Sequence, residues 1–156
     1  MQRYIKMRTK QNNSHFFLYY SRFAVPLHPQ NVIRMKDICC IGHVTKDKIV
    51  TPSSTVYMAG GTSFYFAYAI NQLPKDVSFS LITAMDPTEK EPVEKMLKAG
   101  IDVTLNPSRN TVFFENIYGD NPNDRKQRVL AKADPFTILQ LEHVEAKVFH
   151  LGSLLS

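Results

Sequence analysis

The residues best suited to bind an oxygen-rich ligand are one carboxylate and a pair of glycines. Asp47 stands five residues after Gly42, which ends a short apolar run. A carboxylate beyond the carboxyl end of a buried strand can accept hydrogen bonds from hydroxyl groups. Gly60 and Gly61 precede an apolar stretch of helical spacing. Backbone N–H groups at such a helix start can approach ligand oxygens closely.

Each of these features also has a purely structural explanation. Asp47 lies between Lys46 and Lys48, as a solvated turn aspartate would. The two glycines can serve a turn or close packing and nothing else. Taken one at a time, both features favour the structural explanation, so their order along the chain has to be considered.

The secondary structure that must position these residues can be predicted from residue 37 onward. The alternation of strand, helix, strand, helix and strand predicts a parallel α/β unit with right-handed connections. Short apolar runs predict the strands, and two briefer extended segments lie between the first strand and the first helix. The predicted strands are 38–41, 77–84, 101–105 and 147–151, and the briefer segments are 49–50 and 56–58.

Two helices are predicted between these strands. Residues 62–73 are apolar on almost every side, which predicts a largely buried helix that Pro74 ends. The second helix follows a capping box of Thr88 and Glu91 and stops at Gly100. Pro92 fits that helix only in its first turn.

Residues 111–132 break the alternation. A β-rich segment, 111–118, and an extended one, 127–131, flank the turn-forming residues 119–124. This pattern predicts a β-hairpin that projects from the α/β body and could serve as a lid.

The basic charge of the chain is confined to its first part. The length of 156 residues and the hydrophobic content of 44% are typical of one globular domain, and the net charge is +5. Residues 1–34 hold six Lys and Arg side chains and no acid, so the rest is nearly neutral. This distribution argues against a nucleic-acid partner. For residues 1–35 we consider an over-extended start before Met35 first, a disordered basic arm second and a targeting segment third.

The cysteines, histidines and apolar runs argue against a structural disulfide, a metal site and a membrane-spanning segment. Cys39 and Cys40 are adjacent in a predicted strand and point to opposite faces, which suits core packing in a reducing cytosol. No run approaches the ~20 apolar residues that cross a membrane. His43, His143 and His150 have no paired spacing with acids or cysteines, so no metal site is predicted.

A series of motifs in fixed order gives these residues a context. The series is Gly42 with Asp47, Gly60-Gly61, Met85-Asp86, Lys98-Ala99-Gly100-Ile101-Asp102, Thr111-Val112, and Val148-Phe149-His150-Leu151-Gly152-Ser153. Over residues 36–156 it resembles the amino-terminal half of the ribokinase-like (PfkB-type) carbohydrate kinases. The resemblance implies an α/β sandwich with a largely parallel central sheet and a β-hairpin lid, truncated at its carboxyl end.

The resemblance also implies a reaction and roles. Kinases of this kind transfer the γ-phosphate of ATP, with Mg²⁺, to a hydroxymethyl group of a sugar or related alcohol. Asp47 would bind substrate hydroxyl groups, and Gly60 and Gly61 would form part of a hinge where lid and substrate approach. Arg128, a basic residue of the lid, is a further candidate for substrate binding.

Two positions depart from the family's pattern. Thr45 and Tyr65 stand where such kinases often have asparagine. We keep both as candidate substrate-binding positions. They argue against ordinary ribose or fructose specificity and leave a cyclitol, a nucleoside or an unusual sugar open.

The family's anion hole, catalytic aspartate and adenine-binding loops belong to its carboxyl-terminal half and have no counterpart here. Phosphoryl transfer needs such groups, so we name no catalytic residue and expect the isolated chain to be inactive. We interpret the remaining candidate bases as cap, strand-edge and turn residues: Asp86, Asp102, Asp120 and Asp124. The alternative function is a non-catalytic sugar-binding or dimerising module, with a homodimer through the lid.

Overall fold

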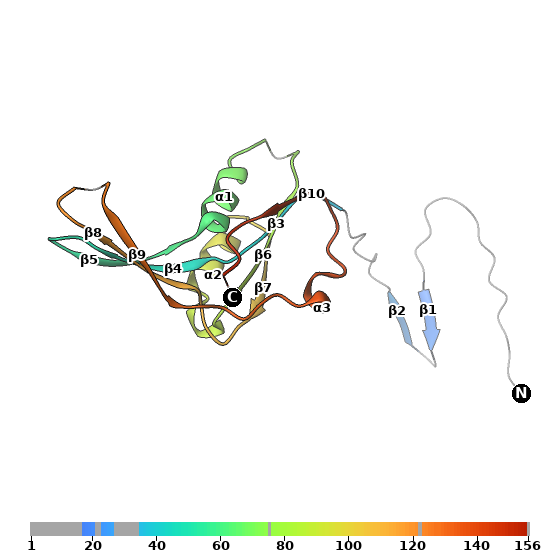
Figure 1. Ribbon diagram of the computed structural model, residues 1–156. Helices are drawn as coiled ribbons and strands as arrows, with labels where there is room; N and C mark the ends of the chain where they lie inside the picture. Colours follow the sequence, from blue (N-terminus) through green and yellow to red (C-terminus); the bar gives the residue numbers. More distant parts are fainter. Residues whose placement is uncertain (1–16, 21–22, 27–34, 75, 122, 156) are drawn as a thin grey trace, which may run out of the picture. The chain divides into compact units, whose positions relative to one another are not determined.

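The computed structural model describes residues 17–20, 23–26, 35–74, 76–121 and 123–155 (Figure 1). They fall into two units, 1–34 and 35–156. In the first unit, strands β1 (Phe17–Tyr20) and β2 (Phe23–Pro26) pair antiparallel. Most of the basic leader lies outside the described residues, so its three interpretations stay predictions.

A four-stranded parallel sheet forms the body of the second unit. Its order is β10-β3-β6-β7, which brings the last strand of the chain beside the first of this unit. The strands are β3 (Lys36–Ile41), β6 (Phe79–Met85), β7 (Val103–Pro107) and β10 (Ala146–Leu151). The predicted parallel α/β class is therefore confirmed, and all four carboxyl ends meet at one edge of the sheet.

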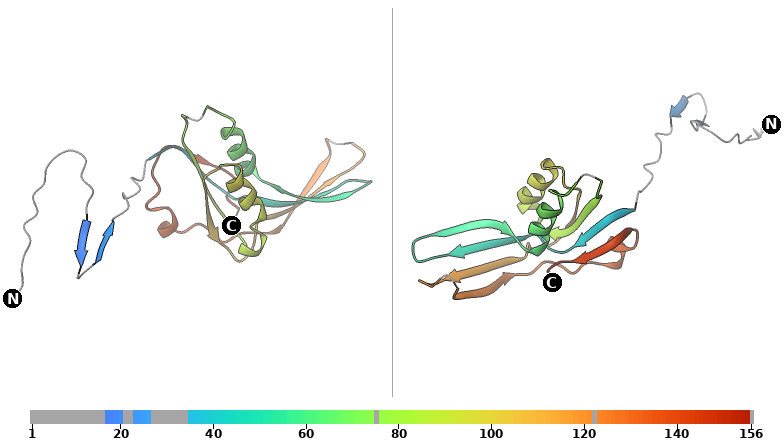
Figure 2. Two further views of the ribbon diagram at one scale, coloured as in Figure 1. Left: turned by 180° about the vertical axis from the view of Figure 1, so that it is seen from behind. Right: turned by 90° about the horizontal axis from the view of Figure 1, so that it is seen from above.

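The two faces of this sheet carry separate hydrophobic cores. Cys40 packs on one side with Ala67 of α1 (Thr62–Ile70) and Met96 of α2 (Glu91–Lys98). Figure 2 shows both helices on that side. Cys39 packs on the other side with Phe136 and Leu141 of the short α3 (Ile138–Leu141). Both thiols are free and fully buried, as the adjacent cysteines predicted.

The structure corrects two helix boundaries. The first helix ends at Ile70, three residues before the predicted end. The predicted capping box of Thr88 and Glu91 is wrong, because the Asp86 carboxylate accepts from the Thr88 N–H and caps a 3₁₀ turn, Pro87–Glu89. Pro92 does lie in the first turn of α2, and Gly100, with φ +84°, follows its end, as predicted.

The lid is wider than the predicted hairpin. Its order is β5-β4-β8-β9, two antiparallel hairpins joined by a parallel pair, and Figure 1 shows it projecting from the body. The strands of this lid sheet are β4 (Thr45–Val50), β5 (Thr55–Gly60), β8 (Phe113–Tyr118) and β9 (Arg125–Ala131). The segments predicted as brief extended pieces are thus half of the lid. In the described part of the chain, no helix is long and apolar enough to span a membrane.

Candidate functional site

Asp47 and Gly60 are built against each other at the root of the lid. A Cβ on Gly60 would lie only 2.5 Å from Oδ2 of Asp47 and 2.8 Å from its Cγ. The other carboxylate oxygen, Oδ1, accepts a hydrogen bond of 2.7 Å from the hydroxyl of Thr45, which is buried. One oxygen is therefore fixed by Thr45, and the other lies over the glycine.

The backbone conformation at position 61 requires a glycine. Its φ of +93° is one that residues with a side chain rarely adopt. A Cβ there would also lie 2.8 Å from the backbone oxygen of His43 and 3.0 Å from Cγ2 of Thr45. Gly61 precedes the first turn of α1, where its carbonyl accepts from Tyr65 N–H at 3.3 Å. The glycine pair thus joins β5 to α1, where Gly61 has a backbone conformation that disfavours a side chain and Gly60 leaves room for the Asp47 carboxylate.

The register of the lid assigns the residues of its strands to one of two faces. Directly paired residues share a face, and successive residues of a strand alternate between faces. Asp47 pairs with Met58 on one neighbouring strand and with Phe114 on the other. We call this side the Asp47 face; it also carries Thr45, Ile49, Val56, Gly60, Asn116, Gln127 and Val129.

Arg128 lies on the opposite side of the lid, which we call the Lys46 face. Its guanidinium is 3.9 Å from the carboxylate of Glu115, which also pairs with Lys48 at 2.9 Å. The hydrogen bond between them raises the pKa of Lys48 and lowers that of Glu115. The structure therefore does not bring Arg128 together with Asp47.

Tyr65 belongs to the exposed surface of α1. Its side chain is 54% exposed, and its ring meets Phe64 edge-on with centroids 5.3 Å apart. The structure thus brings together four of the six predicted substrate-binding residues, namely Thr45, Asp47, Gly60 and Gly61.

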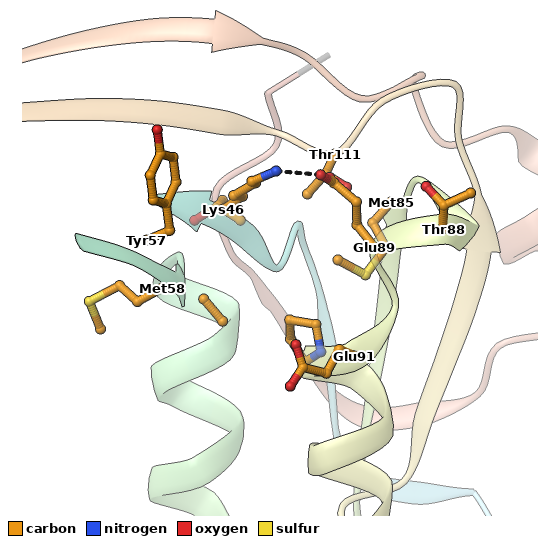
Figure 3. A pocket seen from close by; sticks show the side chains of 11 residues that line it. Lys46, Tyr57, Met58, Met85, Thr88, Glu89, Glu91 and Thr111 are labelled. Atoms are coloured by element: carbon orange, nitrogen blue, oxygen red, sulfur yellow. Dashed lines mark hydrogen bonds and ion pairs between the residues drawn. The ribbon is translucent and has the colours of Figure 1, made fainter. Parts of the chain in front are cut away.

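A cavity of about 290 Å³ lies where the Lys46 face meets the body (Figure 3). Lys46 reaches across it to the carboxylate of Glu89 at 2.5 Å. The hydrogen bond from Lys46 is the main reason why the pKa of Glu89 is lowered. Thr45 and Met58, which belong to the Asp47 face, also contribute to the lining, but Asp47 and the two glycines do not. The Asp47 carboxylate is therefore not part of this cavity.

Other titratable side chains have structural partners. His43 is buried, which lowers its pKa, and its Nδ1 accepts from the Leu155 N–H at 3.1 Å. His150 stacks on Phe66 with centroids 3.9 Å apart. Asp102 pairs with Lys36 at 2.7 Å. Across the described residues, no group of three or more His, Cys, Asp or Glu side chains could hold a metal ion.

Solved structures superpose on the fold of this chain. A pyrophosphate-dependent kinase of the ribokinase family, in a sulfate complex, superposes over 74% of this chain with a TM-score of 0.61 and 26% identity. A structure of such a kinase with a pyrophosphate analogue and myo-inositol superposes over 73% with a TM-score of 0.60 and 27% identity. The fold is ribokinase-like. Neither a family model nor a curated protein sequence matches this chain.

The ribokinase-like fold extends to more distant enzymes. A sugar kinase of Pyrococcus horikoshii, in complex with ATP, superposes over 66% of this chain with a TM-score of 0.53 and 17% identity. This chain spans 40%, 39% and 37% of the three structures. The match therefore concerns less than half of each kinase.

The sequence interpretation missed the other residues of the Asp47 face. Phe114, Asn116 and Gln127 alternate along the two strands of the predicted hairpin, so their shared side could be inferred from that spacing. That this side is also the side of Asp47 depends on the parallel pairing of β4 with β8.

Proposed function

We propose that this chain provides the polyol-binding part of a kinase with the ribokinase-like fold. The reaction would transfer a phosphoryl group to a hydroxyl group of a sugar or a related alcohol, as the sequence resemblance implies. The observation that carries the proposal is the Asp47 carboxylate, with Oδ1 held by Thr45 and Oδ2 packed over Gly60. A carboxylate held in one orientation can accept hydrogen bonds from ligand hydroxyls without first losing rotational freedom.

A cyclitol is the substrate class that we favour. Thr45 and Tyr65 already argued against ordinary ribose or fructose specificity, and one of the superposed kinases was determined with myo-inositol. A sugar with several neighbouring hydroxyl groups would satisfy the same carboxylate. The two buried thiols suit a reducing compartment, and we place the protein in the cytoplasm on that ground.

The phosphoryl donor is assigned by resemblance alone. The sequence resemblance implies ATP with Mg²⁺, whereas two of the three superposed structures are of pyrophosphate-dependent kinases. The described residues offer no cluster of ligands for a metal ion. We therefore assign neither Mg²⁺ nor the donor to a residue here, and propose that the 156-residue chain binds its polyol without transferring a phosphoryl group.

Binding measurements on the chain and one variant test the proposal. Myo-inositol and ribose are titrated into the ¹⁵N-labelled protein, and affinities are taken from the shifts of its amide resonances. We expect Asp47→Asn to weaken myo-inositol binding about ten- to a hundredfold, because it removes a charge-assisted acceptor. Asp120→Asn, in the exposed turn between β8 and β9, makes the same charge change as a control. Unchanged affinity in Asp47→Asn would exclude the proposed site.

The alternative, a sugar-binding module without a kinase reaction, predicts the same binding. A dimerising module predicts instead a homodimer through the lid and no polyol affinity. Sedimentation of wild-type protein with and without myo-inositol separates these two, since only the second requires a dimer in the absence of ligand.

A further inference from the structure

Asn116 is a buried amide on the side of the lid that carries Asp47. Its side chain is 2% exposed, and its neighbour in the register on β4 is the apolar Ile49. Its Oδ1 accepts a hydrogen bond of 2.9 Å from Nε2 of Gln127 on β9. Burial of an amide costs free energy unless the amide is hydrogen-bonded, so the bond from Gln127 compensates for the burial of Asn116.

Register places this amide pair one row away from Asp47. Phe114 is the direct partner of Asp47, and Asn116 follows two residues later on the same face. Gln127 is the direct partner of Asn116 on the next strand. Gln127 lies one row, about 7 Å, along the strands and two strand spacings, about 10 Å, across the sheet from Asp47, so their Cα atoms are about 12 Å apart. A six-membered polyol ring with one hydrogen bond at each end has a comparable length. A carboxylate and an amide pair therefore flank an aromatic side chain on one face.

Gln127 keeps hydrogen-bonding capacity for a ligand. One hydrogen of its Nε2 is used by Asn116, which leaves the second hydrogen and the Oε1 acceptor. Its side chain is exposed, whereas that of Asn116 is buried. Asn116 thus orients the amide, and Gln127 presents it to the solvent side of the lid.

We propose that Gln127, oriented by Asn116, is a specificity-determining residue that binds a second hydroxyl group of the polyol held by Asp47. The apolar C–H face of the ring lies over Phe114, and hydroxyl groups on opposite sides of the ring meet the carboxylate and the amide. The inference rests on the proposed function and extends it. Asn116 is a positioning residue and touches no ligand.

The arrangement selects ring-shaped polyols over short ones. An amide placed to bind a hydroxyl disfavours an analogue that lacks it, because the polar groups of the site are then left unpaired. A short alcohol such as glycerol can reach the carboxylate or the amide but not both. The selected ligand is therefore a cyclitol or a pyranose with hydroxyl groups at both ends.

A cycle of protein and ligand variants tests this role. Myo-inositol and the set of monodeoxy-inositols are titrated into wild-type protein, Gln127→Leu, Asn116→Leu and the control Lys126→Met. Lys126 neighbours Gln127 on the same strand but lies on the opposite face, next to Ile117 in the register. We expect one monodeoxy-inositol to bind wild type about tenfold more weakly than myo-inositol through the loss of this hydrogen bond.

In Gln127→Leu and Asn116→Leu, that analogue and myo-inositol should bind equally well to within twofold, while Lys126→Met keeps the tenfold ratio. A merely structural role would lower both affinities and leave the ratio unchanged. Myo-inositol binding that depends on Asp47 with unchanged ratios in Gln127→Leu would overturn this inference alone. Folded wild-type protein that binds no polyol would overturn the proposed function as well.

Discussion

The carboxylate of Asp47 fills the space that a side chain at Gly60 would need, with Oδ2 2.5 Å from the place of a Cβ. Gly60 is not in the left-handed region, so the requirement for glycine comes from this contact and not from backbone strain. The identity of one residue therefore follows from the position of the other, although thirteen positions separate them.

Gly60→Ala should displace the Asp47 carboxylate and weaken polyol binding about tenfold or more, since the lost contact is a charge-assisted hydrogen bond. The matched control is Gly119→Ala, because no atom lies within 4 Å of a Cβ at that position. Titration of myo-inositol into both variants measures the effect. Equal affinities in the two would show that the Asp47–Gly60 contact does not serve binding.

Gly61→Ala should destabilise the fold more than Gly100→Ala does. Both glycines have positive φ, at +93° and +84°, so each substitution adds about 1–3 kcal/mol of conformational strain. Only at Gly61 would the new Cβ also press on backbone, 2.8 Å from the oxygen of His43. Urea denaturation at neutral pH compares the free energies of unfolding. A larger loss in Gly100→Ala would contradict the packing described for Gly61.

The contact between Lys46 and Glu89 predicts a pH dependence of stability. It lowers the pKa of Glu89 in the folded chain below its usual 4.5, so the pair stabilises the fold above that value. As the pH falls from 4.5 through the folded pKa, Glu89 becomes protonated and this stabilisation is lost.

Glu89→Gln should therefore reduce stability at pH 6 and have little effect at the acid end of the fold's range. Glu145→Gln, at an exposed position that precedes β10, is the control. Denaturant titrations at several pH values compare both variants with wild type. A difference between wild type and Glu89→Gln that does not shrink on acidification would rule out this linkage.

Cys39 and Cys40 should be unreactive in the folded chain. Both are fully buried, and burial raises the pKa of each thiol, which leaves little of the reactive thiolate. Labelling with a thiol-specific reagent should be slow in buffer and complete for both thiols in denaturant. Rapid labelling of either cysteine under native conditions would show that its core opens readily.

The sequence predicted the body better than the lid, for physical reasons. Strands β3 and β6 lie in the middle of a parallel sheet, where both faces are covered, so their apolar runs are visible without knowledge of their partners. Strand β4 carries Asp47 on one face and Lys46 and Lys48 on the other, and therefore shows no alternation of apolar and polar residues.

The candidate site was predicted in part. Motif order singled out Asp47, Gly60 and Gly61, which the structure brings together at one end of the lid. The family resemblance also suggested Arg128, which the register places on the opposite face with Glu115. A strand residue that moves by one position in the register has its side chain on the other face of the sheet. Neither the residue type nor its place in a motif shows which face it occupies.

The side of the lid on which a polyol binds is the most direct test of this account. Myo-inositol is titrated into the ¹⁵N-labelled chain, and the shifts are mapped on assigned amides. We predict the largest shifts at Gly60, Gly61 and the side-chain amide of Gln127. Shifts confined to Thr88, Glu89 and Glu91, around the cavity on the Lys46 face, would contradict it.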